Sequence, residues 1–162
     1  CAGKVRSIGL SNFPVHKIEQ IMEVAQIKPA ALQVELNPYW NQHALKAELA
    51  KIGLGDIVYE GWYPFGHGDA KLLAEPVIAK IAEAHGKTVA QVILRWMLQE
   101  GVVTFPKTTN PQHILDNIDV FDFELSDDEM TRINALPQKA YYDVPEEAPD
   151  FVLVQNDYSK QA

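Results

Sequence analysis

TVAQVILRWMLQEGVVTF, residues 88–105, contains one complete passage from helix to strand and indicates the fold class of the chain. Thr88 is a typical N-cap residue, and the apolar residues after it have the spacing of a helix with a broad buried face. They are Val89, Val92, Ile93, Trp96 and Met97. Gly101 ends this helix, and Val102 to Phe105 has the β-branched and aromatic composition of a strand.

The same alternation of strand and helix extends toward the N-terminus. Strands are predicted at Val5 to Leu10 and at Ala31 to Leu36. A third strand is predicted to begin at Ile57 to Tyr59 and to run into Gly61-Trp62-Tyr63-Pro64. Helices are predicted from Pro14 to about Ala25, from an N-cap at Asn41 to about Lys51, and from Pro76 to His85 with Gly86 as the C-cap.

The part of the chain that follows residue 105 continues with helices and then loses its periodicity. A short helix is expected after Pro111, and Ser126 with Glu129 three residues later forms a capping box that begins another helix. From Gln138 the sequence is rich in Pro, Tyr and acidic residues and predicts an irregular tail. We therefore expect one folded unit at residues 1–136 and a tail or loop at residues 137–162.

Four strands that alternate with helices predict repeated βα units and a parallel sheet. The four units take about 40 residues each, whereas a full (β/α)8 barrel needs about 250 residues, so the chain is expected to be half of such a barrel. A small complete doubly wound sheet is the alternative, but the GxGxxG turn typical of it is absent. The first predicted strand is followed instead by Ser11-Asn12-Phe13.

Composition and charge narrow the classes of partner. The net charge of −8 argues against nucleic acid and anionic membranes, and no apolar stretch approaches a membrane span. The single cysteine, Cys1, excludes an internal disulfide and favours the cytoplasm, with a lipidated Cys1 as the lesser alternative. Five scattered His residues predict no metal site. Because the chain opens without Met and soon enters a strand, we expect it to be the second half of a longer fold.

Five segments, taken in order, resemble the motifs of aldo-keto reductases. Residues 3–13 resemble GKVRxIGVSNF, residues 32–39 the next strand of that family, and residues 62–66 its Y-x-P-L-G strand end. Residues 88–96 resemble TxAQVxLRW, and residues 105–108 resemble IPKS. The resemblance extends to about Leu136 and implies a (β/α)8 barrel, of which this chain is the C-terminal half with strands five to eight. It also implies reduction of an aldehyde or ketone by NAD(P)H.

The resemblance places Ser11, Asn12 and Gln33 at the carboxamide of the nicotinamide, where Asn and Gln side chains complement an amide ligand. The alternative for Asn12 and Gln33 is a strand terminator and a polar core residue. Trp62 stands where the family stacks an aromatic residue, usually Tyr, on the nicotinamide ring. The alternative for Trp62 is an aromatic residue packed at a strand end.

At the other end of the cofactor, the resemblance places Lys107 and Thr108 at the 2′-phosphate of the adenosine, and Asp116 and Asn117 at the adenine. His113 stands where the family has an Arg. Because His is neutral at pH 7 unless its pKa is raised, NADP(H) is favoured and NAD(H) stays open. The alternative for His113 and Asp116 is a solvated helix face with an i, i+3 pair.

The family's catalytic Asp, Tyr, Lys and His come from the first half of its barrel, and no segment here resembles them. No catalytic residue is therefore predicted, and the chain is expected to be inactive by itself. The tail takes the place of the family's variable loop over the substrate pocket, and Tyr141, Tyr142 and Phe151 either line that pocket or pin the tail down. His67 to Asp69 is interpreted as a loop.

Three hypotheses follow. The first is a reductase segment that joins a missing N-terminal half. The second is a catalytically inactive half-barrel that binds a nucleotide or self-associates through its open strand edges. The third is an unrelated α/β nucleotide-binding domain, which would need a phosphate-binding turn that the sequence lacks.

Overall fold

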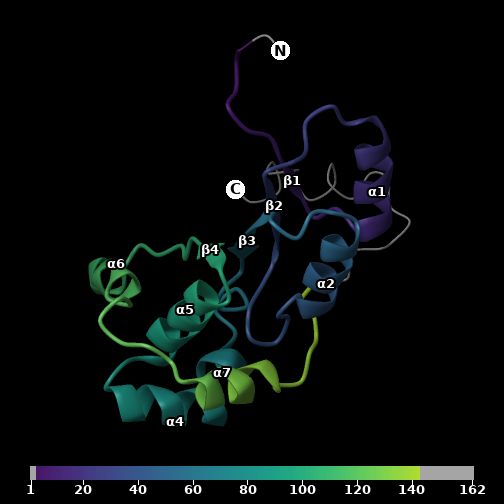
Figure 1. Cartoon of the computed structure of the whole chain (residues 1–162). Coiled ribbons are helices and arrows are strands. Elements are labelled where there is room, and N and C mark those ends of the chain that lie inside the picture. The colour runs from purple at the N-terminus through teal and green to yellow at the C-terminus, as the bar shows by residue number, and fades with distance from the viewer. Residues whose placement is uncertain (1–2, 143–162) are drawn as a thin grey trace.

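A sheet of four parallel strands runs through the middle of the molecule, and its spatial order is the order of the chain (Figure 1). The strands are β1 (Gly9–Ser11), β2 (Ala31–Glu35), β3 (Val58–Trp62) and β4 (Val102–Thr104). The computed structural model describes residues 3–142, so Phe151 and the other tail residues beyond Tyr142 lie outside the described residues. The predicted parallel α/β class is confirmed.

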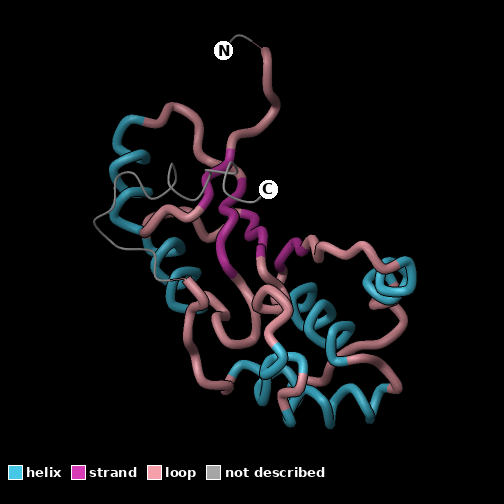
Figure 2. The backbone as a smooth tube through the Cα atoms, turned by 180° about the vertical axis from the view of Figure 1, so that it is seen from behind, coloured by secondary structure: helices cyan, strands magenta, loops and turns pink. Residues whose placement is uncertain are grey.

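Helices connect and flank the strands, as Figure 2 shows. The helices are α1 (Val15–Val24), α2 (His43–Lys51), α3 (Ala70–Leu73), α4 (Pro76–His85), α5 (Val89–Gln99), α6 (Pro111–Ile118) and α7 (Asp127–Asn134). In Figure 1, α1 and α2 lie together on the side of β1 and β2, and α4, α5 and α7 gather on the side of β3 and β4. None of the helices in residues 3–142 is long and apolar enough to cross a membrane.

The capping signals of the sequence are confirmed at three helix ends. Thr88 accepts from the backbone N–H of Gln91, whose side chain accepts from the backbone N–H of Thr88 at 3.0 Å. Ser126 and Glu129 form the same reciprocal pair at the start of α7. Gly86 ends α4 with φ 62°, a left-handed conformation that glycine adopts without strain. Local capping chemistry thus fixes these boundaries.

The prediction of a first strand from Val5 to Leu10 is wrong in its extent. Only Gly9–Ser11 pairs, with β2, and Val5 and Ile8 are 71% and 47% exposed. A strand needs a neighbour for its backbone groups, and in residues 3–142 no strand pairs with β1 on its other side. β1 and β4 are therefore the two edges of the sheet.

Other boundaries differ from the prediction by a few residues. The third strand begins at Val58, one residue later than predicted, and runs to Trp62 as expected, whereas α3 was not predicted. The fourth strand ends at Thr104, before Phe105. The N-cap of α2 is Gln42, which has φ 60°, and not Asn41. The side chain of Asn41 nevertheless accepts from the backbone N–H of His43 at 3.1 Å, so it still satisfies an amide of the first turn.

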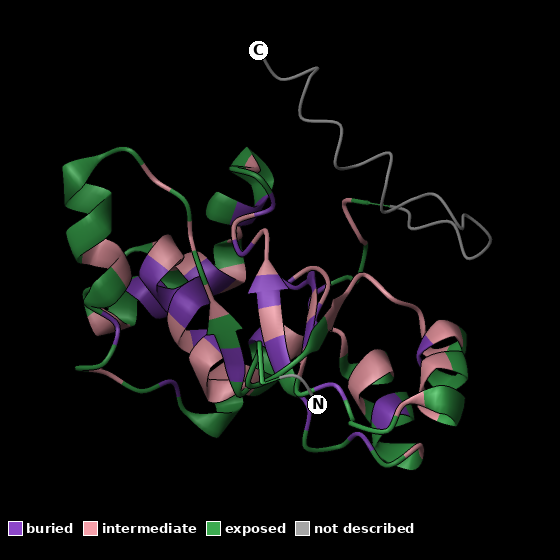
Figure 3. Ribbon diagram, turned by 90° about the horizontal axis from the view of Figure 1, so that it is seen from above, coloured by how far each residue is buried: buried purple, intermediate pink, exposed green. Residues whose placement is uncertain are grey.

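The apolar core lies between the sheet and the helices, and Figure 3 shows it as the buried inner segments of strands and helices. Leu32 and Val34 on β2 are buried, and they alternate with the half-buried Gln33. A Cβ atom added at Gly61 would overlap Cε of Met97 and lie 3.2 Å from Cβ of Leu36. Helix α5 therefore packs directly on the backbone of β3, and the other strand face is left for polar side chains.

A polar network around Glu100 joins three helices. The side chain of Glu100 accepts from Asn134 at 2.9 Å and from Lys46 at 3.3 Å, and lies 2.9 Å from Nε2 of His43. Trp96 donates to Asn134 at 2.8 Å. Burial alone would raise the pKa of Glu100, but the bonds from Asn134, His43 and Lys46 outweigh it and lower the pKa. The network thus holds α2, α5 and α7 together beneath the sheet.

Candidate functional site

Polar side chains form a row across the face of the sheet that the core leaves free. Ser11 on β1 is in register with Gln33 on β2, which is in register with Glu60 on β3. Asn12 follows directly after β1 and donates its backbone N–H to the carbonyl of Gln33 at 2.9 Å. Asn12 has φ 58°, a conformation that Asn tolerates better than most residues. The predicted residues of the first two strands therefore lie side by side.

Two hydrogen bonds fix the orientation of the amide groups in this row. The indole N–H of Trp62 donates to Oδ1 of Asn12 at 2.9 Å, and Nε2 of Gln33 donates to the carboxylate of Glu60 at 2.9 Å. An indole only donates and a carboxylate only accepts, so neither amide can be turned over. Within residues 3–142, Nδ2 of Asn12 and Oε1 of Gln33 have no partner. The row thus offers donor hydrogens and one acceptor to a ligand.

A cavity of about 570 Å³ opens at the carboxyl ends of the strands, and we call it the strand-end cavity. Asn12 and Trp62 line it together with Glu35, Trp40 and Tyr142. Ser11 and Gln33 are not among its lining residues, so the structure brings only two of the four predicted nicotinamide residues to its wall. Ligand sites of parallel α/β sheets lie at this end of the strands.

A second cavity of about 210 Å³, the α6 cavity, lies beside α6 and the segment before it. Its lining includes all five residues predicted for the phosphate and adenine end of a nucleotide. They are Lys107, Thr108, His113, Asp116 and Asn117. Phe65, from the loop after β3, also lines this cavity, and Trp62, the last residue of β3, lines the strand-end cavity. The end of β3 and the loop that follows it therefore connect the two cavities.

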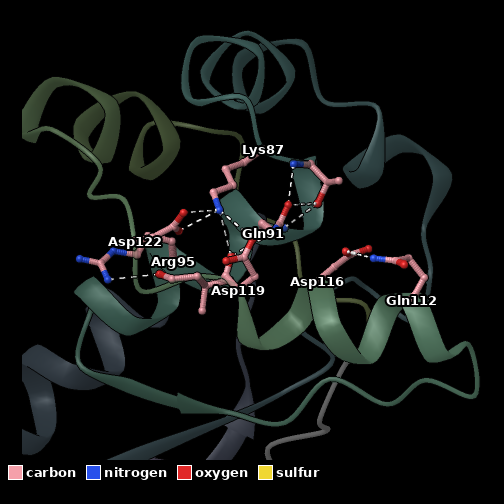
Figure 4. Close-up of polar contacts among 9 residues, drawn as sticks. Lys87, Gln91, Arg95, Gln112, Asp116, Asp119 and Asp122 are labelled. Atoms are coloured by element: carbon pink, nitrogen blue, oxygen red, sulfur yellow. Dashed lines mark hydrogen bonds and ion pairs between the residues drawn. The ribbon is translucent and has the colours of Figure 1, made fainter.

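The alternative predicted for His113 and Asp116 was a pair between the two, but the partner of Asp116 in the structure is Gln112. Asp116 accepts from Gln112, one turn earlier on α6, at 2.9 Å (Figure 4). The C-terminal end of α6 is held separately, because Gln91 of α5 donates to the carbonyl of Asp119 at 2.9 Å. Lys87, just before α5, bonds the carboxylate of Asp119 at 2.8 Å. Side chains in and next to α5 thus fix where α6 lies.

The sequence did not indicate the most buried carboxylate of this region, Glu35, at the end of β2. Its oxygens accept from the backbone N–H groups of Tyr141 at 2.9 Å and Tyr142 at 3.2 Å. Burial raises the pKa of Glu35, and these two bonds together with one from Asn37 only partly offset it. The one available signal was an acidic residue between the apolar Val34 and Leu36.

Tyrosines in and near the cavities carry raised pKa values. The bond between the hydroxyls of Tyr63 and Tyr142, together with burial, raises the pKa of Tyr63 to about 12. Burial and a bond to Glu75 raise the pKa of Tyr39 to about 12. Burial and a bond to Asp69 raise the pKa of Tyr141. A raised pKa makes a phenol a weaker proton donor near neutral pH.

Residues 1–138 match the model of the Aldo/keto reductase family. The chain belongs to the aldo/keto reductase family. It is 48% identical over 134 residues to a glyoxal reductase of Bacillus subtilis, a match that covers 83% of this chain and 47% of that protein. An aldo-keto reductase of Mycolicibacterium smegmatis gives the same identity and coverage. The chain thus spans about half the length of the curated aldo/keto reductases that it matches.

Solved structures agree with the family assignment. The crystal structure of Gox0644 in its apo form has a TM-score of 0.80 and 39% identity, over 89% of this chain and 51% of that one. A mutant of Gox0644 in complex with NADPH has a TM-score of 0.82 and 39% identity, over 90% and 53% of the two chains. The resemblance described from the sequence motifs is therefore confirmed at the level of the family.

Proposed function

We propose that this chain supplies the cofactor-binding half of an NAD(P)H-dependent reductase of aldehydes or ketones. In this proposal, residues 1–136 are the C-terminal half of a (β/α)8 barrel, strands five to eight, and residues 137–162 form a loop over the substrate pocket. The order of the five motifs, the four parallel strands in chain order, and the half-length match to relatives support it. The NADPH complex of a similar chain supports the choice of cofactor.

The nicotinamide end of the cofactor is assigned to Ser11, Asn12, Gln33 and Trp62. A carboxamide has one acceptor and two donor hydrogens, and the free donors of Asn12 and acceptor of Gln33 complement it. The flat ring of Trp62 suits a flat nicotinamide, and its bond to Asn12 holds it in place. When bound, the cofactor supplies hydride, and these residues orient it.

The phosphate and adenine end is assigned to Lys107, Thr108, His113, Asp116 and Asn117. The observation that carries the proposal is that these five residues, all chosen from the sequence, line a single cavity. A Lys ammonium and a Thr hydroxyl are natural partners for a phosphate group. His113 in place of an Arg offers less fixed charge, so NADP(H) is proposed first and NAD(H) second.

No catalytic residue is assigned to this chain, and we expect no turnover from it alone. The Tyr63, Tyr39 and Tyr141 pKa values are raised, which is the opposite of what a tyrosine general acid near pH 7 requires. In this proposal the proton donor and its partners belong to the N-terminal half. The chain's own residues hold and orient the cofactor, and a cytoplasmic location is proposed with it.

Exposed apolar side chains beside both sheet edges support a partner. They are Val5 and Ile8 before β1, Val24 and Ile27 at the end of α1 and after it, and Val103, Phe105, Ile114, Leu115, Ile118 and Phe121 in and after β4; Val58 of the inner strand β3 is exposed as well. The occupant that we propose is the missing N-terminal half, and self-association of this chain is the second candidate. Light scattering of the chain alone tests self-association: a dimer supports it, and a stable monomer at low and high salt excludes it.

Titration of NADPH and NADH into the 162-residue chain, followed by quenching of Trp fluorescence, tests cofactor binding. We expect saturable NADPH binding and a dissociation constant about tenfold higher in Lys107→Ala, the effect of losing one charge-assisted bond. Lys80→Ala is the matched control, because Lys80 lies on α4 and does not line the α6 cavity. Equal binding by Lys107→Ala and Lys80→Ala would overturn the phosphate assignment.

A further inference from the structure

Residues 138–142, which we call the strap, are tied to the end of β2 and to the turn after it. The backbone N–H of Lys139 donates to the carbonyl of Tyr39 at 2.6 Å. The side chain of Gln138 accepts from the backbone N–H of Asn41 at 2.8 Å and donates to the carbonyl of Pro38 at 3.0 Å. These bonds join segments about one hundred residues apart in the sequence.

The carboxylate of Glu35 binds the backbone of the strap. Glu35 is only 5% exposed, and its two carboxylate oxygens accept from the consecutive backbone N–H groups of Tyr141 and Tyr142. Hydrogen bonds from backbone N–H groups to a charged acceptor are stronger than those between neutral groups. Burying a carboxylate is costly unless it is bonded in this way. The strap and Glu35 therefore depend on each other.

The strap is a wall shared by two cavities. Lys139, Ala140 and Tyr141 line both the strand-end cavity, about 570 Å³, and a second space of about 590 Å³ bounded by Tyr39 and Glu75. The next residue, Tyr142, has its ring 5.7 Å from that of Trp62 in an edge-on arrangement. The position of the strap thus sets both the size of the strand-end cavity and the aromatic surface beside Trp62.

We propose that Glu35 is a positioning residue that fixes the strap as the wall between these cavities. Through that wall it limits the size of the carbonyl compound that fits beside Trp62. The identity of this ligand rests on the proposed function, whereas the action of Glu35 on the strap does not. Release of the Glu35 bonds joins the two cavities and withdraws Tyr142 from Trp62.

Limited proteolysis of the 162-residue chain measures this directly, because trypsin cleaves after Lys139, inside the strap. Glu35→Gln keeps one oxygen acceptor but turns an amide N–H₂ toward the other backbone N–H. We expect cleavage after Lys139, followed by mass spectrometry, to become about tenfold faster, as for loss of one bond to a charged group. Glu35→Asp, which keeps both oxygens, is expected to lie between Glu35→Gln and the unchanged chain.

Glu83→Gln is the matched control, since Glu83 is exposed on α4 and far from the strap in sequence. Global unfolding by urea separates positioning from general stability: removal of a buried charge is not expected to lower the midpoint of Glu35→Gln at pH 7. Equal cleavage rates for Glu35→Gln and Glu83→Gln would overturn the proposal. The proposal would also be overturned if Glu35→Gln were cleaved faster only because its global stability toward urea had fallen by the same factor.

The NADPH titration keeps the two proposals apart. If Glu35→Gln accelerates cleavage but the unchanged chain binds no NADPH, the strap inference stands and the proposed function fails. If NADPH binds and Glu35→Gln is cleaved no faster than Glu83→Gln, the proposed function stands and the strap inference fails.

Discussion

Gly66→Ala is expected to dislodge the strap through a clash with the ring of Tyr141. Gly66 has φ +54°, and a Cβ added there would lie 2.5 Å from both Cζ and the hydroxyl oxygen of Tyr141. The ring of Tyr141 is not free to retreat, because its hydroxyl donates to the carboxylate of Asp69 and its backbone N–H is held by Glu35. Either Tyr141 or the loop after β3 must therefore move.

The same loop offers a control that separates backbone strain from the clash. Gly68 has φ +80°, and a Cβ added there meets no heavy atom within 4 Å. Alanine in a left-handed conformation costs about 1–2 kcal/mol, and both variants are subject to that cost. Overpacking adds about 1–3 kcal/mol in Gly66→Ala alone. The free energy of unfolding should therefore fall by about 1–2 kcal/mol in Gly68→Ala and by about 2–5 kcal/mol in Gly66→Ala.

Thermal and urea unfolding measure the difference, which for a chain of this size corresponds to about 2–4 °C in Tm for each kcal/mol. Removal of the ring in Tyr141→Ala should make Gly66→Ala no more costly than Gly68→Ala, because the clash has then lost its partner. A double-mutant cycle across Gly66 and Tyr141 reports this coupling directly. Equal effects of the two glycine substitutions, or strict additivity in the cycle, would refute the placement of Tyr141 over Gly66.

Two further predictions concern residues that hold the helices against one another and against the sheet. Glu100→Gln should lower the free energy of unfolding by about 1 kcal/mol near neutral pH. The folded-state pKa of Glu100 is lowered, so the difference in unfolding free energy between Glu100→Gln and the unchanged chain is full above pH 4.5. This difference closes as the pH falls below that value. A difference that does not depend on pH would contradict the network. Gly61→Ala should cost about 1–3 kcal/mol through its clash with Met97, and less when combined with Met97→Leu. Gly55→Ala, whose Cβ would make ordinary contacts at 3.5 Å, is the control in the same urea experiment.

Features that depend on neighbouring residues in the chain could be predicted, and features that depend on distant residues could not. The Thr88 and Ser126 caps were predicted because each is complete within four residues. The extent of β1 was not, because Val5 to Ile8 has the composition of a strand but lacks a partner in the described sheet. Composition indicates that a segment can be a strand, and only pairing makes it one.

The candidate site divides in the same way. Lys107, Thr108, His113, Asp116 and Asn117 were chosen through a family resemblance, and the structure places them around one cavity. Glu35 was missed because its partners, the N–H groups of Tyr141 and Tyr142, are 106 and 107 residues away. Backbone donors leave no trace in a sequence motif, since any residue type except Pro supplies one.

The distribution of polar and apolar side chains restricts how a partner can cover this sheet. Gln33 and Glu60 are bonded to each other on the face that the helices leave free, so an apolar layer over that face would bury a carboxylate at high cost. Exposed apolar side chains lie at both edge strands, at Ile8 next to β1 and at Val103 in β4, where Val103 is in register with Glu60 on the same face. A partner that pairs with both edges and leaves the polar row facing an interior satisfies both conditions. Closure of the sheet into a barrel does this, because a closed sheet has no edges and keeps one face inside.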